Sequence, residues 1–161
     1  MPETPAIAPF FQELPAEIRT QLEQLATPRK FHPGMTLFQE GARHEEIYFV
    51  VSGRVRLEMF VPGRVRQPLM TVGPGDIAGW SPLFAGHMMT ATAVALEPVQ
   101  TLAINGRALS GLCESDHEAG YHIMRQLVIV LSNRLLATRL QLLDLFQEHQ
   151  PQRPHPVDSE C

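Results

Sequence analysis

The sequence has very little cysteine, with only Cys113 and Cys161 among its 161 residues. Two cysteines cannot form a disulfide scaffold or a tetrahedral cysteine zinc site, and so small a number is typical of a reducing compartment. No apolar run reaches the ~20 residues that span a membrane, and the N-terminus lacks the basic patch and long apolar stretch of a secretory signal. We therefore predict a cytoplasmic protein that does not enter a membrane.

Positive charge is also scarce, because the chain has a single lysine and a formal net charge of −4. A net negative charge is unfavourable for a protein that binds the phosphate backbone of a nucleic acid. The one basic cluster fits the solvated face of two paired strands and consists of Arg54, Arg56, Arg64 and Arg66. The sequence after Phe146 is too short for a helix-turn-helix module. We predict no contact with DNA.

Motifs for catalysis are missing as well. None of the seven histidines pairs at i, i+4 with a carboxylate between, and no glycine-rich phosphate loop is present. Ser52 and Ser81 lack the context of a nucleophile elbow. Cys113 lies in a short apolar segment, where an unreactive core thiol is expected. The sequence therefore predicts no catalytic residue, no metal ligand and no enzyme activity.

Hydrophobic periodicity divides the chain into segments of different type. Residues 10–27 repeat apolar positions at helical spacing. From about 31 to 104, short apolar runs alternate with glycine-containing turns, as in a small β-sandwich or barrel. Asn105 can cap a short helix, and Ser115 with Glu118 can form a capping box for a much longer one.

These segments predict an α+β protein with one domain over residues 10–148. Its centre is an antiparallel β-roll of jelly-roll type (a double-stranded β-helix) over about 31–104, and its long C-terminal helix covers about 116–148. An N-terminal tail of residues 1–9 precedes the domain. Prolines punctuate residues 149–161, which we expect to be disordered.

The long helix has more apolar residues than a helix on a protein surface needs. Val128, Leu135, Leu142 and Phe146 fall near the seven-residue register of paired helices. One interpretation is a central helix buried within its own monomer. The other interpretation is a homodimer formed through this helix. We favour the homodimer because the β unit is too small to cover the whole apolar surface of the helix.

Three segments together resemble the cyclic-nucleotide-binding domain family, specifically the CRP/FNR-type effector domain in a short stand-alone bacterial form without a helix-turn-helix. They are residues 31–41 (FHPGMTLFQEG), 47–55 (IYFVVSGRV) and 73–79 (GPGDIAG). The resemblance extends from about Phe10 to Phe146. It implies the order of this family, namely an N-terminal helix, a β-roll, a short helix and a long dimerisation helix.

The same resemblance places an altered phosphate-binding cassette after Gly79. Relatives that bind cyclic AMP or cyclic GMP have a glutamate directly after this glycine and an arginine further along. Here Trp80 follows Gly79, either Met88 or Met89 stands at the arginine position, and no arginine occurs between Arg66 and Arg107.

Removing one partner of a buried charge pair costs about 3–5 kcal/mol, or roughly two to four orders of magnitude in affinity. The replaced glutamate and arginine therefore argue against a cyclic nucleotide as a high-affinity ligand, and no other cofactor is indicated. The altered cassette can accept an apolar ligand, dock a partner or be filled as core. Its candidate pocket residues are Gly79, Trp80, Ser81, His87, Met88, Met89 and Thr90.

We therefore predict a non-enzymatic regulatory or accessory subunit, a homodimer that binds a partner protein or a larger complex. One alternative is a stand-alone cyclic-nucleotide sensor that relays ligand binding through its C-terminal helix. Another, based on similar size and fold, is a small dimeric subunit of an NAD-reducing soluble hydrogenase-type complex.

Overall fold

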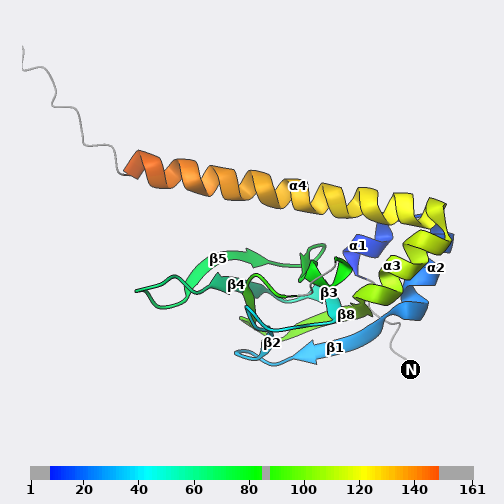
Figure 1. Ribbon diagram of the computed structural model, residues 1–161, viewed down its shortest axis with the longest axis horizontal. Helices are drawn as coiled ribbons and strands as arrows, with labels where there is room; N and C mark the ends of the chain where they lie inside the picture. Colours follow the sequence, from blue (N-terminus) through cyan, green and yellow to red (C-terminus); the bar gives the residue numbers. More distant parts are fainter. Residues whose placement is uncertain (1–7, 85–87, 149–161) are drawn as a thin grey trace, which may run out of the picture. The chain divides into compact units, whose positions relative to one another are not determined.

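The computed structural model describes residues 8–84 and 88–148 and confirms the predicted α+β fold with an antiparallel β-roll. The chain divides into two compact units, one ending at Val130 and the other beginning at Leu131. The first unit holds the β-roll and its flanking helices (Figure 1). In the described part of the chain, no helix combines the length and the apolar character needed to cross a membrane.

The β-roll consists of two four-stranded antiparallel sheets. The first contains, in spatial order, β1 (Thr27–Phe31), β8 (Val99–Asn105), β3 (Glu46–Ser52) and β6 (Ile77–Ala78). The second contains β2 (Thr36–Phe38), β7 (Thr92–Ala95), β4 (Val55–Met59) and β5 (Gln67–Val72). Because strands that are distant in sequence are neighbours in each sheet, the roll brings the β6–β7 connection next to the β2–β3 connection.

Inward-facing side chains from both sheets form one hydrophobic core. Alternate residues of a strand point to the same face, so a strand with one face on this core contributes every second side chain to it. In β4, for example, Val55 and Leu57 are buried and Arg56 between them is only partly buried. The core residues that line the roll include Leu37, Phe38, Tyr48, Val72, Met89 and Ala103.

The N-terminal helix predicted over residues 10–27 is wrong as a single element. The structure has α1 (Pro9–Gln12), then α2 (Ala16–Leu25), and β1 already begins at Thr27. Pro15 causes the break, because it has no N–H to donate and its ψ of 146° is extended. Phe10 and Phe11 of α1 are buried against Phe49, with ring centroids 4.9 and 5.1 Å away.

Two C-terminal helices follow the roll, α3 (Gly106–Ser115) and α4 (His117–Glu148). Asn105 caps α3 as predicted, because its Oδ1 accepts hydrogen bonds from the backbone N–H groups of Arg107 and Ala108 at 3.0 and 3.2 Å. The predicted cap of the long helix is wrong by one residue. Asp116, not Ser115, accepts from the N–H of Ala119 at 3.0 Å, whereas Ser115 is the last residue of α3.

The turn between β3 and β4 requires glycine at position 53. Gly53 has a φ of 83°, and a Cβ there would lie 2.3 Å from the carbonyl oxygen of Pro98. We expect Gly53→Ala to lower the free energy of unfolding by about 3 kcal/mol or more, because the backbone must move as well as adopt a left-handed conformation. Urea unfolding followed by circular dichroism measures this loss.

Gly63 supplies the control for that experiment. Its φ is 77°, but a Cβ at this position would meet nothing within 4 Å. Gly63→Ala therefore carries only the backbone cost of about 1–2 kcal/mol. Equal losses in the two variants would show that the close approach of Pro98 does not matter.

Candidate functional site

The cassette begins where β6 ends, at Gly79, and this glycine faces the interior of the roll. Its φ is 76°, and a Cβ here would lie 2.8 Å from Met89 Cε and 2.9 Å from Phe38 Cε1. The next residue, Trp80, is partly buried and precedes the 3₁₀ helix η1 (Ser81–Leu83). Any side chain at position 79 would therefore collide with core residues from two other segments.

Of the two candidates for the arginine position, Met89 is the one that enters the roll. Its side chain is 3% exposed and belongs to the hydrophobic core, whereas Met88 is 51% exposed. The backbone N–H of Met89 donates to Ala42 at 3.0 Å, and its carbonyl accepts from Gly41 at 2.8 Å. These two bonds fix Met89 against the β2–β3 connection.

The structure brings only part of the predicted pocket together. Gly79 and Met89 are in contact range, while Met88 and Thr90 lie on the surface. Ser81 is partly buried at the start of η1. His87 lies outside the described residues.

Aromatic rings line the interior beside Met89. Phe38 stacks on Tyr48 with ring centroids 6.4 Å apart, and the His44 ring lies 5.7 Å from Phe38 and 5.4 Å from Tyr48. Burial lowers the pKa of His44, although Glu46 and Glu45 oppose this shift. Burial also raises the pKa of Tyr48, as does Glu46, whose carboxylate accepts a hydrogen bond from the Tyr48 hydroxyl. Both side chains are therefore uncharged at neutral pH.

This environment is poorly suited to a cyclic phosphate. The side chains that meet beside Gly79 are those of Met89 and Phe38, which are both apolar. An anion placed beside Met89 would lose its hydration without gaining a charged partner there.

Three of the four arginines in the basic cluster predicted from the sequence form ion pairs. Arg54 pairs with Glu97 at 3.2 Å, and Arg56 and Arg66 both contact Glu58 at 3.2 and 3.5 Å. These contacts support the interpretation of a solvated strand face.

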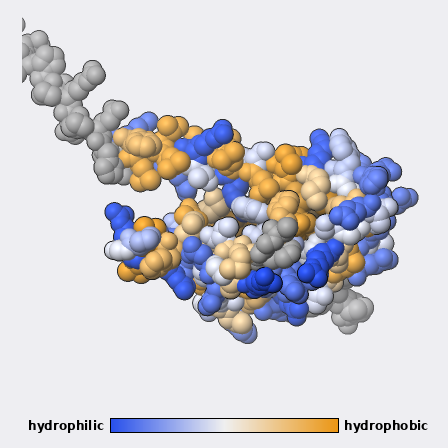
Figure 2. Space-filling view, viewed as in Figure 1, coloured by the Kyte–Doolittle hydropathy of each residue, from blue (hydrophilic) through white to orange (hydrophobic). Residues whose placement is uncertain are grey.

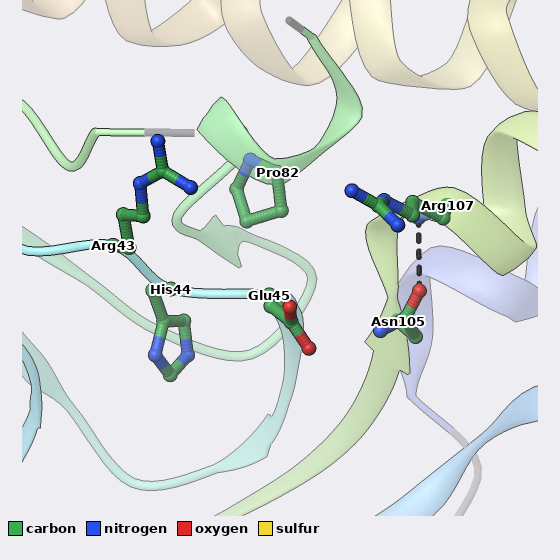
Figure 3. Close-up of a pocket in the computed structure, with 6 residues that line it drawn as sticks. All are labelled: Arg43, His44, Glu45, Pro82, Asn105 and Arg107. Atoms are coloured by element: carbon green, nitrogen blue, oxygen red, sulfur yellow. Dashed lines mark hydrogen bonds between the residues drawn. The ribbon is translucent and has the colours of Figure 1, made fainter. Parts of the chain in front are cut away.

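Sequence reasoning missed a pocket on the outer side of the cassette (Figure 3). It is lined by Arg43, His44, Glu45, Pro82, Asn105 and Arg107. The β2–β3 connection, η1 and the start of α3 each supply part of this lining. No motif joins these residues in the sequence, so only the fold reveals the pocket.

Within the described residues, no group of three or more histidine, cysteine, aspartate or glutamate side chains is placed to hold a metal ion.

Cys113 on α3 is half-buried, and burial together with Glu114 raises the pKa of its thiol. A raised pKa lowers the fraction of reactive thiolate at neutral pH. We expect iodoacetamide to alkylate Cys113 about tenfold more slowly than a free thiol such as glutathione, and unfolding in urea should abolish the difference. Peptide mass spectrometry separates Cys113 from Cys161; equal rates for Cys113 in the folded and unfolded protein would contradict this expectation.

The residues predicted to form a dimer seam are exposed in the single chain. Val128, Leu135, Leu142 and Phe146 have exposed fractions of 60, 52, 50 and 70%. Hydrophobic side chains gather along the C-terminal part of α4 (Figure 2).

Within the second unit, six of the exposed apolar residues form two stripes, and Leu145 lies on neither of them. At ~100° per residue, Leu135, Leu142 and Phe146 lie within about 40° of one another around the helix axis. We call these three residues the first stripe. Leu136, Leu140 and Leu143 are also at least half exposed and form a second stripe about 100° further round.

Comparison with known proteins identifies the family. The family model of the cyclic nucleotide-binding domain matches residues 28–116. The chain therefore belongs to the cyclic nucleotide-binding domain family, which confirms the resemblance seen in the sequence.

The similar proteins include named regulators. The chain is 29% identical over 153 residues to a CRP-like cAMP-activated global transcriptional regulator of Mycobacterium tuberculosis, with 95% of this chain and 66% of the relative covered. It is 32% identical over 142 residues to the cyclic AMP receptor protein of Thermus thermophilus, with 86% and 60% covered. The chain thus spans slightly less than two thirds of the length of either relative.

A solved structure of the catabolite activator protein of Thermus thermophilus also matches. Its TM-score is 0.68 at 27% identity, and the match covers 87% of this chain and 63% of that one. The β-roll and the helices that follow it are therefore those of a known regulator fold.

Proposed function

We propose that this protein is a non-enzymatic regulatory or accessory subunit that acts by binding a partner protein and does not bind cyclic nucleotides tightly. The observation that carries the proposal is the placement of Met89. The end of its side chain lies in the interior beside Gly79, as does the ring of Phe38, at the position where a cyclic phosphate would need a guanidinium.

The surface of α4 supports the part of the proposal that concerns binding to a partner protein. A homodimer formed through the first stripe covers Leu135, Leu142 and Phe146 with the same residues of a second copy. A two-helix seam is narrow, so the second stripe remains available to another protein. We therefore assign the first stripe to self-association and the second stripe to the partner.

A cyclic-nucleotide sensor is the second candidate function. It is favoured by the names of the relatives, one described as cAMP-activated and one as a cyclic AMP receptor. Under this alternative, the ligand must displace Met89 from the core.

Thermal unfolding in the presence of millimolar cyclic AMP or cyclic GMP separates the two candidates. A ligand at a hundredfold excess over its Kd stabilises the folded state by about 2.7 kcal/mol, which shifts the melting temperature of a protein this size by several degrees. We expect a shift below about one degree with either nucleotide. A shift of several degrees would reject the proposal in favour of the sensor.

A further inference from the structure

The pocket on the outer side of the cassette is separate from the interior site. It shares only Pro82 with the cassette, and none of Gly79, Trp80 or Met89 lines it. The carbonyl oxygen of Pro82 would lie 2.2 Å from a Cβ on Gly106, so η1 and the start of α3 are packed tightly behind the pocket. The backbone N–H of Gly106 also donates to the Glu45 carbonyl at 2.8 Å, which holds the β2–β3 connection to the same place.

Two arginines give the pocket its charge. Figure 3 shows the guanidinium groups of Arg43 and Arg107 on either side of Pro82. In the part of the chain that the structure describes, neither group has an ion-pair partner, whereas Arg29, Arg54 and Arg56 each do. Two guanidinium groups and a single carboxylate, that of Glu45, leave the pocket lining with a net positive charge, which favours an anion from solution.

The other lining residues narrow the choice of anion. The His44 ring turns away from Pro82 in Figure 3, toward its contacts with Phe38 and Tyr48. The backbone N–H groups of Arg107 and Ala108 already donate to Asn105 Oδ1, so they are not free for a ligand, whereas the side-chain amide N–H groups of Asn105 are hydrogen-bond donors in the lining. The carboxylate of Glu45 also lines the pocket and is its acidic group.

A carboxylate beside two guanidinium groups suits an anion that carries its own proton. A hydrogen phosphate group can accept hydrogen bonds from both arginines and donate its P–OH to Glu45. Sulfate has no such proton at neutral pH, so Glu45 would repel it. The free space is about 50 Å³, enough for a few waters or one phosphate group, since one water needs about 10–15 Å³.

We propose that Arg43, Glu45 and Arg107 form a binding site for a protonated phosphate group on the outer side of the cassette. The group can belong to free phosphate or to a small phosphomonoester. Because the site lies between the β2–β3 connection, η1 and α3, an occupant bridges three segments that meet behind the cassette.

The test is isothermal titration of the full chain at about pH 6, where a phosphate group keeps part of its protons, with inorganic phosphate, glycerol phosphate and sulfate in turn. We expect saturable millimolar binding of phosphate, and sulfate binding at least about fivefold weaker. Tighter binding of glycerol phosphate than of inorganic phosphate would identify a phosphomonoester as the occupant, and the reverse order would identify the free ion.

Three single variants and one control complete the test. Arg43→Gln and Arg107→Gln should each weaken phosphate binding at least about fivefold, while Glu45→Gln should reduce the preference for phosphate over sulfate. Arg64→Gln, which removes the same charge from outside the pocket lining, should leave binding unchanged. The proposal fails if binding does not saturate, if sulfate binds as well as phosphate, or if Arg64→Gln weakens binding as much as the pocket variants.

Discussion

Cyclic AMP is expected to bind the double variant Trp80→Glu, Met89→Arg at least about a hundredfold more tightly than the parent protein. The two substitutions restore the carboxylate after Gly79 and a guanidinium at the position that enters the roll. A charge-assisted bidentate contact to the cyclic phosphate then replaces the thioether of Met89. Isothermal titration calorimetry of the parent, the two single variants and the double variant measures the gain.

The same variant should be less stable without ligand. The side chain of Met89 is buried among apolar core residues, and a charge placed there without a partner costs about 3–5 kcal/mol. Cyclic AMP supplies the missing counter-charge, so it should raise the melting temperature of the double variant by several degrees.

Met88→Arg is the matched control for the buried substitution. Met88 is the neighbouring methionine, but its side chain is exposed and its backbone pairs with Arg43. An added guanidinium there should change neither the stability nor the affinity for cyclic AMP. If Met88→Arg created binding and Met89→Arg did not, the assignment of Met89 to the phosphate position would be wrong.

The sequence was sufficient to predict the fold because its strongest signals are local. Glycines such as Gly53 and Gly79 mark turns that need a left-handed backbone, and the predicted cap at Asn105 depends on contacts within three residues. The prediction of a single N-terminal helix was wrong for a related reason. Helical spacing continues across Pro15, but the proline ends one helix and begins another.

The site was less predictable, because it depends on which neighbours fold against each residue. The spacing in the sequence did not distinguish Met88 from Met89. The two are neighbours, and a shift of one residue along the chain decides which side chain enters the roll. Arg43 and Arg107 lie far apart in sequence and share a pocket only because the β2–β3 connection is held against the start of α3. No pattern in the sequence predicts that contact.

Introducing aspartate into the first stripe should convert the protein into a monomer. Leu135 and Leu142 are about half exposed in the single chain, and their seven-residue spacing puts both on one side of α4. In a two-fold dimer each position occurs twice, so the double variant Leu135→Asp, Leu142→Asp loses four apolar contacts. At about 1.5 kcal/mol for each leucine, the dimer weakens by roughly four orders of magnitude, and sedimentation equilibrium should show a single-chain mass.

Leu143→Asp tests whether that loss is specific to the first stripe. Leu143 is as exposed as Leu142, yet it lies on the second stripe, about 100° away around the helix. Leu143→Asp changes charge and volume as much as Leu142→Asp alone does, and it should leave a dimer of unchanged mass, because the second stripe does not face the other copy in the proposed seam. If Leu143→Asp dissociated the dimer and the first-stripe variant did not, the second stripe would be the one that forms the dimer and the first stripe would be left for the partner. A parent protein that is already monomeric at micromolar concentration would reject self-association through this helix altogether.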